Sequence, residues 1–213
     1  VTLVGGIEAD AVAFAKEWGI PHCSLDLEAC LKQPGVEAVV LTTPNQIHAS
    51  QTELALNMGK HVLVEIPMGL SLEESERVVE LEEKSGLVCM VCHTQRYDPA
   101  HREIYRRVKE GALHLYHIVS ETYFLRRENT NRFGKPRTWT DDLLWHQGCH
   151  MVDLIFWLLD DPDMEAWGQV GPDHPQLGIP MDVNAPMGPR RVIRPSASSA
   201  MIAGMPNKTN KIR

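Results

Sequence analysis

The strongest constraint on the fold is an alternation of short apolar runs with helix-like segments over roughly the first 120 residues. Apolar runs typical of strands buried on both faces of a parallel sheet occur at 1–4, 37–42, 61–65 and 87–92. Segments with helical spacing occur at 9–18, 49–58, 71–85 and 99–109. The alternation predicts βαβ units and an α/β fold with a mostly parallel sheet.

The helix expected at 71–85 carries sequence signals at both ends. Ser71 and Glu74 stand three residues apart, which is the capping-box pattern in which the two side chains satisfy free amide groups of the first turn. Gly86 follows the last helical residue and predicts the end of the helix.

The pattern changes at about residue 114. The alternation in 116–124 predicts a longer strand with one exposed side, and 140–159 predicts an amphipathic helix. From about residue 172 the chain has no usable periodicity, and its last acidic residue is Asp182. We therefore expect a dinucleotide-binding domain at 1–113, a partial α+β domain at 114–182, and an aberrant or disordered tail at 183–213.

Ligands of open α/β sheets bind beyond the carboxyl ends of the strands. Special or polar residues follow every predicted strand of the first domain, at 5–6, 43–48, 65–67 and 93–96. The turn at 43–48 is either a ligand-binding turn or an ordinary strand-to-helix turn capped by Asn45. Glu65, before Ile66 and Pro67, either reaches a ligand from a tight turn with a possible cis bond or is solvated.

The predicted helix at 140–159 gathers several chemically capable side chains. His146, Cys149, His150 and Asp153 are spaced at i, i+3, i+4 and i+7, which places them on one helical face. Three interpretations are open: a zinc site, a histidine general base supported by a carboxylate, and packed core histidines.

The five cysteines are an odd number, and no secretion signal precedes them, so we expect reduced thiols and a cytoplasmic protein. Cys89, Cys92 and His93 match a haem-attachment pattern, but buried apolar thiols account better for cysteines in a predicted strand.

The formal net charge of −7 argues against a nucleic-acid partner, and no apolar run approaches the ~18 residues of a membrane span. Arginines nevertheless gather in the middle of the chain. They suit carboxylate or phosphate ligands, or form a solvated loop face: Arg96, Arg126, Arg127, Arg132 and Arg137.

Four motifs in order resemble the Gfo/Idh/MocA family of NAD(P)-dependent oxidoreductases: TTPNQIH, HVLVEIP, HTQRYDP and HQGCHMVD. The resemblance covers about residues 1–182. It implies a Rossmann-type parallel sheet followed by part of an α+β substrate and dimerisation domain, and a homodimer at full length. It also implies NADP or NAD as the cofactor, bound by Thr43, Pro44, Asn45, His48, Glu65 and Pro67.

The resemblance also implies the chemistry. Ile66 stands where the family usually has a lysine, so the role of base passes to His150, with Asp153 in support and His146 beside it. The string at 123–154 resembles members that oxidise the hemiacetal of a small carboxylated semialdehyde from aromatic ring cleavage. Its carboxylates would bind the arginines, namely Arg96, Arg126, Arg127 and Arg137.

The sequence also departs from the family pattern. It contains no G-x-G-x-x-G loop, so we expect a fragment that lacks the first strand, with a frame-shifted tail after about residue 187. Gly6 and Ile7 occupy positions where an arginine could bind the 2′-phosphate of NADP, so the choice between NAD and NADP stays open. Two alternatives are a zinc-dependent hydrolase or lyase using His146, Cys149 and His150, and a catalytically dead ligand-binding fragment.

Overall fold

The computed structural model describes residues 1–123, 130, 134, 136, 144–161, 163–176, 178 and 180–189, without the side chains of His146 and Pro189. The chain forms two compact units that divide between Cys92 and His93. The sequence placed the domain boundary later, after residue 113, so the helix at 99–109 lies in the second unit rather than the first.

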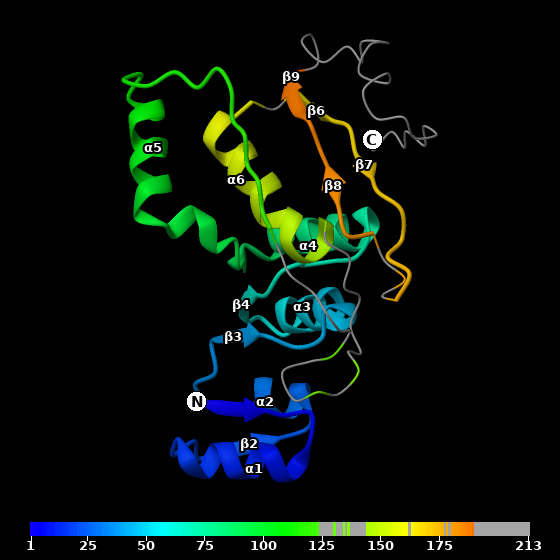
Figure 1. Cartoon of the computed structure of the whole chain (residues 1–213). Helices are drawn as coiled ribbons and strands as arrows, with labels where there is room; N and C mark the ends of the chain where they lie inside the picture. Colours follow the sequence, from blue (N-terminus) through cyan, green and yellow to red (C-terminus); the bar gives the residue numbers. More distant parts are fainter. Residues whose placement is uncertain are drawn as a thin grey trace. The chain divides into compact units, whose positions relative to one another are not determined.

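The first unit has the predicted strand–helix alternation (Figure 1). Its elements are β1 (Thr2–Val4), α1 (Glu8–Glu17), β2 (His22–Ser24), α2 (Leu27–Leu31), β3 (Ala38–Leu41), the 3₁₀ turn η1 (Asn45–Ile47), α3 (His48–Asn57), β4 (His61–Val64), α4 (Leu72–Ser85) and β5 (Cys89–Val91). All strand pairs in this unit are parallel, which confirms the α/β prediction.

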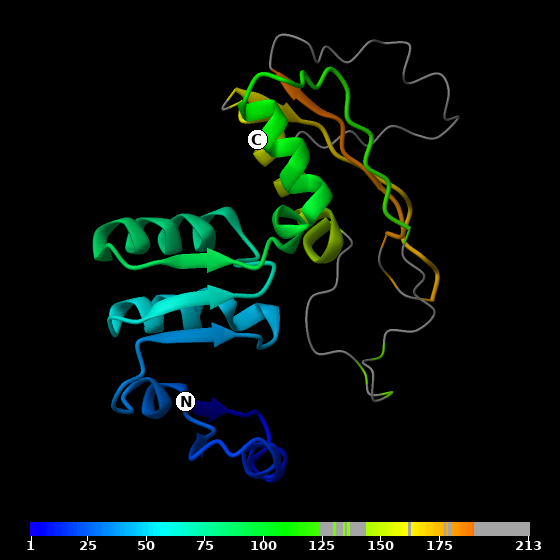
Figure 2. The ribbon, with the colours of Figure 1, turned by 90° about the vertical axis from the view of Figure 1, so that its left-hand side faces the viewer.

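The strands form a two-stranded sheet, β1–β2, and a three-stranded sheet with the order β3–β4–β5. In the larger sheet Val39 lies beside Val62, and Val64 lies beside Val91. Figure 2 shows the arrows of β3, β4 and β5 pointing the same way, so their carboxyl ends share one edge. That edge is where the sequence predicts ligand-binding residues.

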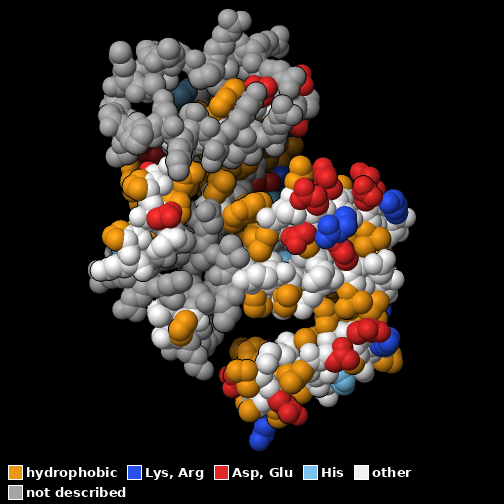
Figure 3. All heavy atoms as spheres, turned by 90° about the vertical axis from the view of Figure 1, so that its right-hand side faces the viewer, with side chains coloured by type: hydrophobic (Ala, Val, Ile, Leu, Met, Phe, Trp, Pro, Cys, Tyr) orange, Lys and Arg blue, Asp and Glu red, His pale blue; other side chains and the backbone are white. Residues whose placement is uncertain are grey.

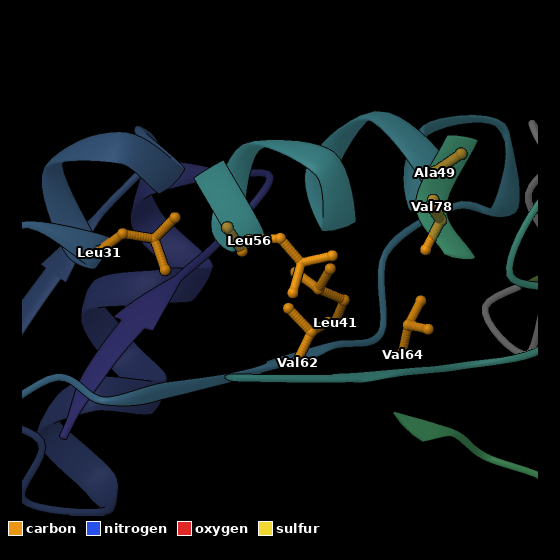
Figure 4. Packing of buried hydrophobic residues seen from close by; sticks show 8 residues of the cluster. Leu31, Leu41, Ala49, Leu56, Val62, Val64 and Val78 are labelled. Carbon is orange, nitrogen blue, oxygen red and sulfur yellow. The ribbon is translucent and has the colours of Figure 1, made fainter. Parts of the chain in front are cut away.

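The core of the first unit lies between the three-stranded sheet and the helices α3 and α4 (Figure 4). Leu41, Val62 and Val64 of the strands are at most 3% exposed, and Leu56 of α3 and Val78 of α4 are equally buried. Burying such side chains contributes about 1.5–3 kcal/mol each, so this cluster holds the shared edge rigid.

Both predicted ends of α4 are confirmed. The Ser71 hydroxyl accepts a hydrogen bond from the Glu74 amide at 3.1 Å, and the Glu74 carboxylate accepts one from the Leu70 amide at 2.8 Å. Gly86 ends the helix with φ = 66°, in the left-handed region that glycine adopts without steric cost.

The second unit contains the 3₁₀ turn η2 (Thr94–Tyr97), α5 (Pro99–Lys109), the π-helical turn η3 (Leu144–Gly148) and α6 (Cys149–Leu159). Two antiparallel pairs follow, β6 (Met164–Ala166) with β9 (Met187–Pro189) and β7 (Gln169–Val170) with β8 (Val183–Asn184). The helix predicted over 140–159 is therefore realised as η3 and α6, and 140–143 lie outside the described residues.

Two predictions from the sequence differ from the structure of the second unit. Residues 116–123 form no strand, and Tyr116 and Tyr123 are 94% and 87% exposed. Alternation predicts which side chains share a face, but a strand also needs a neighbour for its amide groups. Residues 183–189, predicted to lie in an aberrant tail, instead supply β8 and β9, whereas 190–213 lie outside the described residues.

In Figure 3 the acidic and basic side chains of the described residues are interspersed, and these described side chains form no continuous basic stripe. None of the described helices is long and apolar enough to cross a membrane.

Candidate active site

The first part of the candidate site is the cofactor edge, by which we mean the residues directly after β3, β4 and β5. Thr43 follows β3, and its hydroxyl donates to the Gln51 side chain of α3 at 2.6 Å. Asn45, at the start of η1, is only 7% exposed. Polar side chains thus stand at the sheet edge where the sequence predicts them.

His48 is the first residue of α3 and is 1% exposed. Its Nδ1 lies 2.8 Å from the Pro67 carbonyl oxygen, and its Nε2 lies 2.7 Å from the Thr43 carbonyl oxygen. The imidazole therefore bridges the loop after β3 and the loop after β4. Sequence reasoning placed His48 at this edge but did not predict that it joins the two loops.

The loop after β4 turns sharply at the predicted place. The peptide bond between Ile66 and Pro67 is cis, and the Glu65 carboxylate accepts a hydrogen bond from the Ile66 amide at 3.2 Å. Burial, followed by the nearby Glu65 carboxylate, raises the pKa of the Cys92 thiol. The Cys92 thiol therefore stays protonated at neutral pH, beside Glu65 at the edge.

The second part of the candidate site is a cluster in the second unit, made of His93, Arg96, His150 and Asp153, which we call the imidazole cluster. Arg96 binds the Asp153 carboxylate through two hydrogen bonds, from Nε to Oδ2 at 2.7 Å and from Nη2 to Oδ1 at 2.5 Å. The bonded carboxylate raises the pKa of Arg96 above its usual value. Asp153 is 11% exposed and Arg96 is 40% exposed, so the carboxylate is mostly desolvated while the guanidinium stays partly in water.

His93 belongs to this cluster although sequence reasoning did not select it. Its Nε2 lies 3.6 Å from Asp153 Oδ1, and its ring meets the His150 ring edge-to-face with centroids 6.3 Å apart. Burial lowers the pKa of His93, Asp153 raises it, and Arg96 and His150 lower it further. His93 is thus uncharged at neutral pH.

Two ring nitrogens of the cluster stand out. Nδ1 of His93 and Nδ1 of His150 are both buried, and neither has a hydrogen-bond partner among the residues that the structure describes. Buried polar atoms are normally bonded, so each of these two nitrogens has hydrogen-bonding capacity that the described residues leave unused. The sequence feature that could have identified His93 as a site residue is its position in segment 93–96, directly after a predicted strand.

Aromatic side chains support the cluster. The Tyr105 ring of α5 stacks on the Trp157 ring of α6, with centroids 4.0 Å apart and planes 5° from parallel. The guanidinium carbon of Arg96 lies 5.9 Å from the centroid of the Trp157 ring. This cation–π contact holds the arginine in place beside Asp153.

The zinc interpretation is not tested as a whole, because the side chain of His146, one of its three ligands, is not described. Burial raises the pKa of the Cys149 thiol to about 11 in the metal-free protein. No group of three or more His, Cys, Asp or Glu side chains in the described part of the chain is arranged to hold a metal ion. The Cys89 thiol is likewise held protonated, with its pKa raised to about 11.

Several predicted site residues lie outside the described residues. Arg126, Arg127, Arg132 and Arg137 are among them, and the side chain of His146 is not described. Arg96 is described, and two of its N–H groups are already engaged by Asp153.

Comparison with known families identifies the class of protein. Residues 1–93 match the Gfo/Idh/MocA model, described as an oxidoreductase family with an NAD-binding Rossmann fold. Residues 99–192 match the model of the C-terminal domain of bacterial oxidoreductases. The two matches together cover most of the chain, which belongs to the Gfo/Idh/MocA family of oxidoreductases.

Two curated relatives show which members of the family this chain is similar to. The 4-carboxy-2-hydroxymuconate-6-semialdehyde dehydrogenase of Sphingobium sp. (strain NBRC 103272 / SYK-6) is 41% identical over 184 residues, which are 86% of this chain and 58% of the relative. The NAD(+)-dependent scyllo-inositol 2-dehydrogenase of Bacillus subtilis (strain 168) is 36% identical over 107 residues, which are 50% of this chain and 31% of the relative. The chain thus spans only part of the relatives that it matches.

Solved structures confirm the Rossmann-type fold. The WlbA dehydrogenase of Bordetella pertussis, solved with NADH and UDP-GlcNAcA, superposes with a TM-score of 0.74 at 20% identity. The match covers 89% of this chain and 56% of that one. The apo scyllo-inositol dehydrogenase of Lactobacillus casei gives a TM-score of 0.62 at 19% identity, over 83% and 51% of the two chains.

Proposed function

We propose that the whole protein is an NAD(P)-dependent dehydrogenase that oxidises the hemiacetal of 4-carboxy-2-hydroxymuconate-6-semialdehyde to 2-pyrone-4,6-dicarboxylate. The observation that carries the chemistry is the imidazole cluster. In it the buried Nδ1 of His150 has no hydrogen-bond partner among the described residues, and Arg96 fixes the Asp153 carboxylate nearby. The named relative at 41% identity supports the choice of substrate.

In the proposed reaction the hemiacetal carbon loses a hydride and its hydroxyl group loses a proton, which leaves a ring carbonyl. His150 is the general base that accepts the proton, because a neutral imidazole has a lone pair suited to this transfer. Asp153 and Arg96 fix the geometry of the cluster, and His93 packs against the His150 ring. We assign the substrate carboxylates to Arg126, Arg127 and Arg137.

The cofactor edge fits the nicotinamide half of a dinucleotide, because polar groups follow three adjacent parallel strands. The residues that would hold it are Thr43, Pro44, Asn45, His48, Glu65 and Pro67. When bound, the dinucleotide supplies the hydride acceptor. We propose NADP or NAD in this role, a cytoplasmic homodimer as the assembly, and aromatic catabolism as the context.

A titration of the chain with NADPH and NADH, followed by nicotinamide fluorescence, tests cofactor binding. Because the chain contains no G-x-G-x-x-G loop, we expect weak but saturable binding of at least one of the two nucleotides. No binding of either would contradict the proposal for this chain.

The catalytic role is tested by His150→Ala in an assay with the semialdehyde. Loss of a general base lowers kcat by about 10²–10⁴-fold, with a smaller change in KM. His101→Ala is the matched control, because the His101 ring contacts the Gln95 carbonyl oxygen, 2.9 Å from its Nδ1, outside the cluster. An unchanged kcat in His150→Ala would remove this residue from the mechanism.

A further inference from the structure

His48 holds an unusual position among the histidines of the first unit. Both of its ring nitrogens lie within hydrogen-bond distance of backbone carbonyl oxygens, Nδ1 at 2.8 Å from Pro67 and Nε2 at 2.7 Å from Thr43. A carbonyl oxygen can only accept hydrogen bonds. A neutral imidazole has a single N–H group, so it can donate to one of these two oxygens but not to both.

The environment of His48 makes this mismatch costly. The residue is 1% exposed, so water cannot separate a nitrogen lone pair from the carbonyl lone pair that faces it. Burial also disfavours a charged ring, and a cation at the first residue of α3 opposes the helix dipole. Two charge-assisted hydrogen bonds act against these effects, because both carbonyl groups turn their negative ends toward the ring.

We propose that His48 is an imidazolium that donates one hydrogen bond to each carbonyl and so fastens the loop after β3 to the loop after β4. His48 is then a positioning residue of the cofactor edge, and this assignment of the edge rests on the proposed function. The protonation of the ring does not rest on it, because it is argued from the two distances to carbonyl oxygens and from the exclusion of water between these atoms. A fixed positive charge beneath this edge also favours an anionic ligand.

The first unit contains a matched comparison in His61, the first residue of β4. Its Nδ1 accepts a hydrogen bond from the Val88 amide at 3.0 Å, so this nitrogen carries a lone pair and not a proton. The two histidines therefore differ in one respect that can be measured directly: His48 bears protons on both ring nitrogens, and His61 on one at most.

The test is nitrogen-15 NMR of the whole chain at pH 7, with histidine side chains labelled and the signals assigned from the His48→Gln and His61→Gln variants. We expect both ring nitrogens of His48 to be protonated and Nδ1 of His61 to be unprotonated. An unprotonated ring nitrogen in His48 would overturn the proposal, whether or not NADPH binds. Lack of binding of both NADPH and NADH with a doubly protonated His48 would instead count against the proposed function alone.

The fastening role has its own measurement. In His48→Gln we expect the backbone amides of residues 65, 66 and 68–70 to exchange with deuterium at least about tenfold faster than in the wild type, because the bridge between the loops is weakened. The His61→Gln variant should leave these amides unchanged. Equal exchange in His48→Gln and the wild type would show that the histidine does not hold the two loops together.

Discussion

At the scale of single residues, the arrangement of Asp153 differs from the simplest expectation. The sequence assigns this carboxylate to the support of His150, whereas its two closest bonds come from Arg96. The side chain of His93 also lies near it, with Nε2 3.6 Å from Oδ1. Arg96 precedes Asp153 by many residues, and a pairing between distant positions has no signature in local spacing.

This arrangement makes the Asp153→Asn variant informative. The carboxylate raises the pKa of His93, so its loss should lower that pKa further below the ordinary value. NMR titration of the His93 ring protons measures the shift. The variant should also lose about 1–2 kcal/mol of stability, less than a fully buried pair because Arg96 is 40% exposed.

Asp160→Asn is the control for this variant. Asp160 ends α6, pairs with Lys109 and is 69% exposed, so the same change of charge occurs in a solvated place. We expect no change in the titration of His93. An equal shift in both variants would mean that His93 responds to the overall charge of the unit rather than to Asp153.

At the scale of elements, two neighbouring valines of α4 contribute differently to the stability of the fold. Val78 is 1% exposed and belongs to the core cluster, while Val79 is 49% exposed. Val78→Ala should cost about 2–3 kcal/mol, because it removes buried methyl groups and leaves a cavity. Val79→Ala should change stability by less than about 1 kcal/mol. Urea unfolding of the two variants compares them, and similar midpoints would contradict the packing.

The end of α4 gives a second prediction at this scale. Gly86 has φ = 66°, and a Cβ added there would meet no atom within 4 Å. Gly86→Ala should therefore cost about 1 kcal/mol from backbone strain alone.

Gly6→Ala is the matched control, because Gly6 has equal open space but no positive φ. Thermal unfolding should show a lower midpoint for Gly86→Ala only. A comparable loss in Gly6→Ala would assign the effect to something other than the left-handed backbone.

At the scale of the whole molecule, the division into two compact units predicts separate responses to core substitutions. Val64→Ala, at a position 0% exposed in the first unit, should accelerate hydrogen exchange in β3, β4 and β5. The amides of α6 in the second unit should keep their protection. Leu158→Ala, at 5% exposure in α6, should have the opposite pattern. Uniform acceleration throughout the chain in either variant would show that the two units unfold as one.

Much of the first unit could be predicted because its signals are local. The capping box of Ser71 and Glu74, the glycine at the end of α4 and the apolar runs of β3 and β4 each involve residues close in sequence. The prediction of a strand at 116–124 was wrong for residues 116–123, because alternation of side chains does not reveal whether a partner strand is available.

The sequence by itself determined the parallel α/β order, the polar residues at the carboxyl edge and the helix that carries His150 and Asp153, because periodicity and turn chemistry act over a few residues. Only the tertiary structure decided that His93 joins His150, that Arg96 binds Asp153, and that His48 bridges Thr43 and Pro67. These contacts join segments separated along the chain, and packing alone brings such segments together.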